Sequence, residues 1–219
     1  MKKNSLQNSK LYVILAPGDA ERIGLSVEEA ARQAVLGGAD IVQLRDKSTD
    51  DGAALERALR TADAVHALGG IFIVNDRPDI AKRAGADGVH LGQSDLPHLE
   101  ARGMLGPDFM IGRSTHSLDQ AVRAEEEGAD YIGYGPIFAT PTKPDYPAVG
   151  LDGIRAVTDR VQIPLFAIGG IDFLRLSEAV SRGARRVAVV RAAFESRSVF
   201  ESVRRLKKEI VKLDAVHAP

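Results

Sequence analysis

The sequence contains no cysteine, which excludes disulfide bonds, thiolate metal sites and cysteine nucleophiles. It has no run near the roughly 18 consecutive apolar residues that a membrane span needs. Its first ten residues include lysines but lack the apolar segment of a signal peptide. The formal net charge is −1, so no overall positive field attracts nucleic acid or an anionic membrane. We therefore expect a cytoplasmic protein that binds neither nucleic acid nor membranes; a homo-oligomer is compatible with this composition.

What the sequence does contain is a series of short apolar runs rich in β-branched residues, each followed by a longer segment with helical spacing. Alternating strands and helices predict a parallel sheet with helices outside it. Eight such runs in a chain of 219 residues predict an α/β fold, a single (β/α)8 TIM barrel, and an open doubly wound sheet is the alternative. The runs lie at residues 11–15, 40–44, 71–75, 87–91, 109–113, 131–135, 164–168 and 186–190.

Signals at the ends of the predicted helices support this interpretation. Ser26 and Ser117 are the expected N-caps of helices over 26–38 and 117–130, with Glu29 and Gln120 in the reciprocal position of a capping box. A repeated phrase, GAD or GAR, follows helices at 38–40, 85–87, 128–130 and 183–185, where the glycine supplies a left-handed cap before the next strand. We expect one barrel domain over residues 11–213, flanked by a disordered N-terminal tail (1–10) and a short C-terminal tail (214–219).

Polar residues and glycines collect where the predicted strands end. In a (β/α)8 barrel the carboxyl ends of the strands form the active site. Gln43, Arg45 and Lys47 occupy alternate positions from the end of the second run onward, so their side chains face the same side. Three polar side chains on one side are costly in a core and suited to the wall of a pocket. The other strand ends carry Asn75, Asp76, Gln93, Asp95, Ser114, His116, Thr140, Thr142, Lys143, Gly169, Gly170, Val190 and Arg191.

These residue types predict a site for phosphorylated ligands. Arg45, Lys47 and Lys143 are cations suited to phosphate oxygens. Asp76 and Asp95 are hard oxygen ligands of the kind that hold Mg²⁺ beside a substrate phosphate. Each has a structural alternative, because the aspartates could cap the helices that follow them and Lys143 could be a solvated loop residue. The adjacent glycines after the seventh run predict a second phosphate site formed by backbone N–H groups, or else a tight turn.

Several of these stretches together resemble the thiamine-phosphate synthase family. They are QLRDK (43–47), VND (74–76), DGVHLGQSD (87–95), GRSTHS (112–117), GADYIGYGPIFATPTK (128–143), IGGI (168–171) and VVRA (189–192). The resemblance extends from Leu11 to Phe194 in the family's order. It implies a Mg²⁺-dependent transferase that condenses 4-amino-5-hydroxymethyl-2-methylpyrimidine diphosphate with hydroxyethylthiazole phosphate, or its carboxylated form. The products would be thiamine phosphate and diphosphate.

The resemblance also implies roles for individual residues. The pyrimidine diphosphate would be bound by Gln43, Arg45, Lys47, Asn75, Ser114 and Lys143, of which Arg45, Lys47, Ser114 and Lys143 would act in catalysis. Asp76 and Asp95 would hold Mg²⁺. The thiazole phosphate would lie against Thr140, Thr142, Gly170, Val190 and Arg191. No protein nucleophile is implied, because the aminopyrimidine itself supports positive charge as diphosphate leaves.

The chain departs from the family at Arg191, where a serine is usual, and after the first run, where an aspartate is usual and Asp19 stands nearby.

Two other functions are compatible with the same residues. A thiazole tautomerase of the same superfamily would use His116 as its acid–base group, although the paired aspartates and the Thr-x-Thr-Lys loop favour the synthase. A barrel that binds phosphorylated ligands without catalysis is the other alternative.

Overall fold

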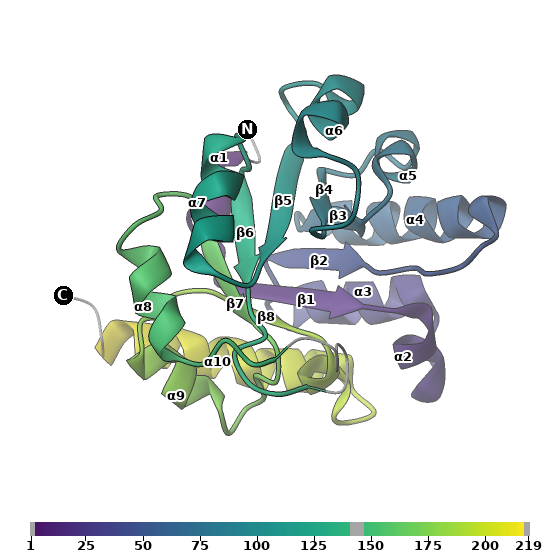
Figure 1. The fold of residues 1–219 in the computed structure, drawn as a ribbon. Coiled ribbons are helices and arrows are strands. Elements are labelled where there is room, and N and C mark those ends of the chain that lie inside the picture. Colours follow the sequence, from purple (N-terminus) through teal and green to yellow (C-terminus); the bar gives the residue numbers. More distant parts are fainter. Residues whose placement is uncertain (1–2, 141–146, 217–219) are drawn as a thin grey trace.

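The computed structural model describes residues 3–140 and 147–216 (Figure 1). Within them, eight parallel strands close into a barrel in chain order, because β8 (Val187–Val189) pairs with β1 (Leu11–Leu15). The predicted (β/α)8 barrel is therefore confirmed, and the alternative of an open sheet is wrong. The other strands are β2 (Ile41–Leu44), β3 (Ile71–Asn75), β4 (Gly88–Leu91), β5 (Met110–Thr115), β6 (Tyr131–Tyr134) and β7 (Leu165–Ile168).

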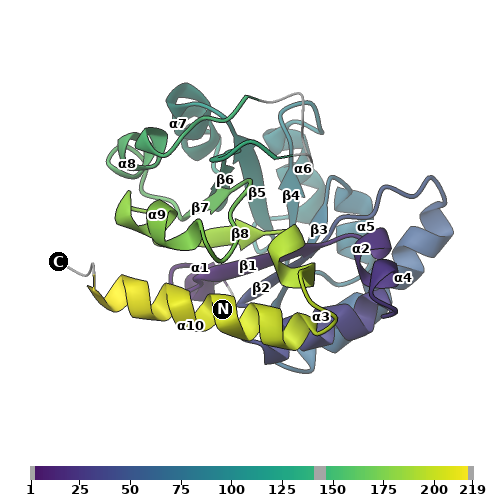
Figure 2. The same ribbon diagram turned by 90° about the horizontal axis from the view of Figure 1, so that it is seen from below.

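Every predicted apolar run becomes a strand, and the largest shift at an end is that of β5, which ends at Thr115 rather than at residue 113. The helices surround the barrel, and Figure 2 shows the longest of them, α10, lying along its outside beside α3. None of the helices in the described ranges is both long and apolar enough to span a membrane. They are α1 (Lys3–Leu6), α2 (Pro17–Arg22), α3 (Val27–Leu36), α4 (Asp51–His66), α5 (Pro78–Arg83), α6 (His98–Leu105), α7 (Leu118–Glu126), α8 (Asp152–Thr158), α9 (Leu176–Ser181), the 3-10 helix η1 (Arg191–Phe194) and α10 (Val199–Val216).

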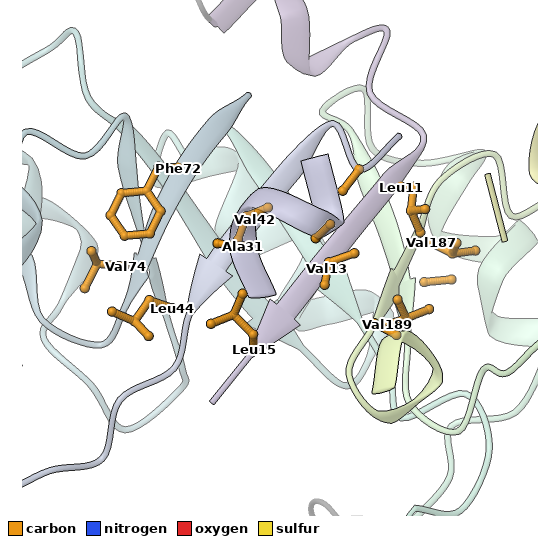
Figure 3. Packing of buried hydrophobic residues seen from close by; sticks show 14 of the residues in the cluster. Leu11, Val13, Leu15, Ala31, Val42, Leu44, Phe72, Val74, Val187 and Val189 are labelled. Atoms are coloured by element: carbon orange, nitrogen blue, oxygen red, sulfur yellow. The ribbon is translucent and has the colours of Figure 1, made fainter. Parts of the chain in front are cut away.

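The strands are buried on both faces, so the core has two layers. Alternate residues of a strand point to opposite sides. Leu11, Val13 and Leu15 of β1 therefore pack outward against the helices, with neighbouring strands contributing side chains such as Val42 and Val189 (Figure 3). The intervening residues fill the inside of the barrel. This interior cluster consists of Leu6, Tyr12, Ile14, Ile41, Ile71, Ile73, Met110, Tyr131, Phe166 and Ala188.

The repeated Gly-Ala-Asp phrase ties the amino-terminal end of the barrel together. Its glycines have positive φ, as predicted for left-handed caps. Its aspartates have a role that the sequence analysis did not anticipate, because each accepts a hydrogen bond from the backbone N–H of the neighbouring strand. Asp40 Oδ2 accepts from Leu11 at 2.9 Å, and Asp87 Oδ2 accepts from Phe72 at 2.8 Å. Asp130 Oδ2 likewise accepts from the N–H of Ile111 at 2.8 Å.

The expected N-caps are formed, but the second half of each capping box differs from the prediction. Ser26 Oγ accepts from the N–H of Glu29 at 3.3 Å, and Ser117 Oγ accepts from the N–H of Gln120 at 3.2 Å. The Glu29 carboxylate accepts from side chains further along its own helix. Gln120 Oε1 accepts from the backbone of His116, one residue before the cap. The helix starts are therefore right and the reciprocal contacts are wrong.

The described parts of the two expected tails, residues 3–10 and 214–216, have defined structure. Residues Lys3–Leu6 form α1. Leu6 is only 2% exposed, because it packs against the interior cluster of the barrel. At the other end, α10 continues to Val216, and Asp214 forms an ion pair with Lys10 at 2.6 Å. The two ends of the described chain thus belong to the barrel's amino-terminal face.

Candidate active site

A cavity of about 530 Å³ opens at the carboxyl ends of the strands. It is lined by every described residue that the sequence analysis assigned to the site, together with His116 and several interior side chains. Thr142 and Lys143 lie outside the described residues. The predicted site residues that line the cavity are Gln43, Arg45, Lys47, Asn75, Asp76, Asp95, Ser114, Thr140, Gly170, Val190 and Arg191.

The segment after β2 forms one wall of this cavity, and its alternation is as predicted. Gln43, Arg45 and Lys47 all face inward. Asp46, between the two cations, points away and forms an ion pair with Arg57 of α4 at 2.6 Å. Gln43 is 2% exposed, whereas Lys47 reaches out to the rim of the cavity. The wall therefore places an uncharged amide deep in the barrel and two cations near its mouth.

Two carboxylates from different strand ends meet beside these cations. Asp76 follows β3 and forms an ion pair with Lys47, while Asp95 accepts a hydrogen bond from the N–H of Gly92 at 2.5 Å. Burial and the neighbouring carboxylate of Asp95 raise the pKa of Asp76. The pKa of Asp95 is lowered, because its contacts with Asp76 and the Gly92 N–H outweigh the opposing effect of burial. Two neighbouring carboxylates repel each other, and a bound cation would relieve this repulsion.

The helix-capping alternative for these aspartates is wrong. The N-cap of α5 is Arg77 and that of α6 is Pro97, and neither helix has a side-chain cap. Asp76 also has a φ of 62°, in the left-handed region that non-glycine residues rarely adopt. Such a conformation costs on the order of 1 kcal/mol or more and is concentrated at functional sites. Neither aspartate caps the helix that follows it, and both line the cavity.

Two glycines after β7 shape the opposite side of the cavity. Gly169 and Gly170 have φ values of +99° and +65°. A Cβ atom on Gly170 would lie 2.7 Å from Phe138 Cβ, so only glycine allows the two loops to approach this closely. Val190 and Arg191 line the same side, Arg191 being the first residue of η1. Asp19 lies in α2 and is not among the residues that line the cavity.

His116 also lines the cavity, and its Nδ1 lies 2.5 Å from the carbonyl oxygen of Gly135. The cavity is also lined by residues that were not predicted from the sequence, among them Tyr12, His90 and Tyr131. These three stand at inward-facing positions of β1, β4 and β6, among side chains that otherwise form an apolar core. The available signal was a polar group at an inward position of a buried strand, the same signal that identified Gln43.

Comparisons with known proteins agree with this geometry. The family described as thiamine monophosphate synthase matches residues 11–193. A thiamine-phosphate synthase of Thermosynechococcus vestitus is 46% identical over 94% of this chain and 57% of its own length. One from Methanocella arvoryzae is 44% identical over 90% of this chain and 92% of its own. The solved structure of a thiamine phosphate pyrophosphorylase from Pyrococcus furiosus superposes with a TM-score of 0.86 at 33% identity, covering 97% of this chain and 99% of that one. The chain spans little more than half the length of several of the curated relatives that it matches.

Proposed function

The chain belongs to the thiamine monophosphate synthase family, and we propose that it is a transferase with that family's activity. It joins 4-amino-5-hydroxymethyl-2-methylpyrimidine diphosphate to hydroxyethylthiazole phosphate or its carboxylated form, and it releases diphosphate. The observation that carries this proposal is the composition of one cavity: paired carboxylates and cations on one side, and a glycine turn with Arg191 on the other. Such a cavity suits two phosphorylated substrates, of which one is bound with a metal ion.

The donor set of Asp76 and Asp95 fits Mg²⁺. Magnesium is commonly held by one or two carboxylates, with substrate phosphates and water completing its six ligands. The raised pKa of Asp76 beside a second carboxylate marks a place where a divalent cation relieves repulsion. When bound, Mg²⁺ would neutralise charge on the diphosphate oxygens and so make diphosphate a better leaving group.

The other residues bind and orient the two substrates. Arg45 and Lys47 hold the diphosphate, together with Lys143 beyond the described residues, and Gln43, Asn75 and Ser114 hold the aminopyrimidine end. The second substrate's phosphate lies against Thr140, Thr142, Gly170, Val190 and Arg191. The backbone N–H groups at the glycine turn can approach a phosphate closely because no side chain intervenes.

The reaction is a substitution at the pyrimidine methylene carbon. The bond between this carbon and the diphosphate oxygen breaks, and its electron pair leaves with diphosphate. The thiazole nitrogen supplies its lone pair to the same carbon, which forms the new C–N bond and leaves the thiazolium positively charged. Cations from two loops stabilise the charge that grows on the leaving group, and the cavity holds the two substrates in line. No side chain forms a covalent bond.

The test is product formation from the two purified substrates, in Mg²⁺ and in EDTA, followed as thiamine phosphate and as released diphosphate. Asp76→Ala should lower kcat/KM by about 10²–10³-fold, the usual loss when one such stabilising group is removed. The matched control is Asp79→Ala, because Asp79 is an exposed carboxylate three residues away that pairs with Arg77 on the outside. A folded wild-type protein that yields no product in Mg²⁺ would refute the proposed function.

A thiazole tautomerase is the second candidate, because His116 lies in the same cavity. It would convert the thiazole substrate without Mg²⁺ and without releasing diphosphate, and His116→Ala would abolish that conversion. A barrel that only binds phosphorylated ligands would retain both substrates unchanged in the same assay. The proposed synthase acts on small molecules in the cytoplasm. The proposal is compatible with a homo-oligomer.

A further inference from the structure

A chain of hydrogen bonds crosses the inside of the barrel and connects two of the proposed substrate-binding residues. Gln43 Nε2 donates to the Tyr12 hydroxyl at 2.6 Å, and this hydroxyl lies 3.0 Å from that of Tyr131. The Tyr131 hydroxyl is 3.2 Å from His90 Nδ1, and His90 Nε2 is 3.0 Å from Ser114 Oγ. The chain therefore runs from β2 through β1, β6 and β4 to β5.

The middle of this chain is buried among aromatic rings. Tyr12 and Tyr131 are 2% and 0% exposed, and both rings meet Phe166 edge-on at 5.4 and 5.7 Å between centroids. Burial raises the pKa of both tyrosines, so each keeps its one proton. Hydrogen bonds in such surroundings are strong, and an unpaired member is costly. The chain is therefore expected to keep every link satisfied.

Counting protons along the chain sets its direction. The amide of Gln43 donates to Tyr12, so the single Tyr12 proton is available for Tyr131, and the Tyr131 proton is available for His90 Nδ1. A neutral His90 then carries its proton on Nε2 and donates to Ser114 Oγ. The hydroxyl proton of Ser114 is left to point elsewhere, and Ser114 lines the cavity.

The opposite end of the chain presents an acceptor. Gln43 Oε1 has no hydrogen-bond partner among the described residues. It is not one of the fully buried side-chain atoms that lack a partner, and Gln43 lines the cavity. The cavity therefore meets an acceptor at Gln43 and a donor at Ser114. Reversing the chain would exchange the two, because turning the Gln43 amide forces every following proton to turn with it.

We propose that Tyr12, Tyr131 and His90 are positioning residues, which hold Gln43 as an acceptor and Ser114 as a donor toward the pyrimidine substrate. This inference rests on the proposed function. An aminopyrimidine diphosphate offers an exocyclic amine as donor and ring nitrogens and phosphate oxygens as acceptors, which complements these two ends. A rigid chain fixes the recognition pattern before the substrate arrives, so less free energy is lost in ordering the side chains on binding.

The kinetic test compares Tyr12→Phe, Tyr131→Phe and the double variant with Tyr134→Phe. Tyr134 is the matched control, because it is a buried tyrosine of β6 whose hydroxyl lies toward Gly153 of α8, outside the chain. Each single variant should raise KM for the pyrimidine diphosphate about tenfold, the value of one buried hydrogen bond, and change kcat and the thiazole KM little. The double variant should cost no more than one single variant, because a chain needs breaking only once. Additive losses, or variants that behave like Tyr134→Phe, would overturn the proposal.

A second measurement does not depend on catalysis. The tautomer of His90 can be read from its ring ¹⁵N shifts in the substrate-free protein, with His90→Asn to assign the signals. The proposal requires the Nε2–H tautomer in the wild type and in Tyr134→Phe, and a loss of this preference in Tyr131→Phe. An Nδ1–H tautomer in the wild type would refute the direction of the chain. If the wild type forms no thiamine phosphate but shows the required tautomer, the proposed activity fails while the chain itself stands.

Discussion

Alanine replacements at Gly170 and Gly85 together separate two effects of a side chain at the glycine turn after β7. Gly170 has a φ of +65°, and a Cβ atom there would lie 2.7 Å from Phe138 Cβ and 3.1 Å from the carbonyl oxygen of Ala139. Gly85 has almost the same φ, +64°, but a Cβ atom there would have nothing within 4 Å. Gly85→Ala therefore measures backbone strain alone, and Gly170→Ala measures strain together with the displacement of the segment that leads to Thr140.

The two variants should differ clearly in stability. A left-handed alanine costs about 1 kcal/mol in the free energy of unfolding, and an overlap in a packed region adds about 1–3 kcal/mol. Gly85→Ala should therefore lower the free energy of unfolding by about 1 kcal/mol and Gly170→Ala by about 2–4 kcal/mol. At about 2–4 °C per kcal/mol for a chain of this size, Gly170→Ala should lower Tm several degrees further than Gly85→Ala does.

The kinetic consequence should be confined to one substrate. Gly170→Ala should raise KM for the thiazole phosphate at least about tenfold, because both the backbone N–H groups and Thr140 are displaced, and should leave KM for the pyrimidine diphosphate nearly unchanged. Gly85→Ala should alter neither KM. Thermal unfolding and steady-state kinetics with each substrate varied in turn measure both effects. Equal Tm values for the two variants, or an unchanged thiazole KM in Gly170→Ala, would show that the close approach of the loops has no role.

Two other predictions concern stability. Leu6→Ala should lower the free energy of unfolding by about 2–3 kcal/mol, because Leu6 is buried in the interior cluster. The control Leu174→Ala, at a side chain that is 83% exposed, should change it by no more than about 0.5 kcal/mol. Denaturant unfolding measures both, and equal effects would mean that Leu6 is not packed. Burial, with Arg102 and Arg113 nearby, lowers the pKa of His98 below its ordinary 6.5, so its contribution to stability is complete above that pH and is lost as the pH falls through the lowered pKa. His98→Leu should therefore lose less stability than the wild type between about pH 7.5 and 5, and an equal loss in denaturant titrations at both pH values would contradict this assignment.

The barrel could be predicted because its signals are local. A run such as residues 71–75 is apolar and β-branched, and Ser26 or Ser117 caps a helix through a contact three residues away. The ends of the chain carry no such signal. A four-residue helix has no hydrophobic period, and Leu6 is ordered by contacts with strands far along the sequence. Structure in the described parts of the expected tails could not be predicted, because tertiary packing decides it there.

The positions of the site residues could be predicted for a topological reason, but their pairing could not. Parallel strands in a closed barrel bring all their carboxyl ends to one face, so polar residues after different strands must converge. The sequence does not reveal that Lys47 pairs with Asp76, that Asp95 takes the N–H of Gly92, or that Asp76 adopts a left-handed conformation. These features depend on how each loop turns after its strand, which spacing alone does not determine.

The hydrogen-bond chain inside the barrel did leave a trace in the sequence, in two glycines that interrupt apolar strands. A glycine within a buried strand weakens it and often marks a close approach by another group. A Cβ atom on Gly112 would lie 2.1 Å from the ring of Tyr131, and one on Gly133 would lie 3.4 Å from the ring of His90. Gly112 therefore makes room for the central tyrosine of the chain, and Gly133 lies directly against its histidine. An inward tyrosine or histidine on one strand and an inward glycine on another strand against it together indicate a polar group accommodated inside the barrel rather than a defect of its core.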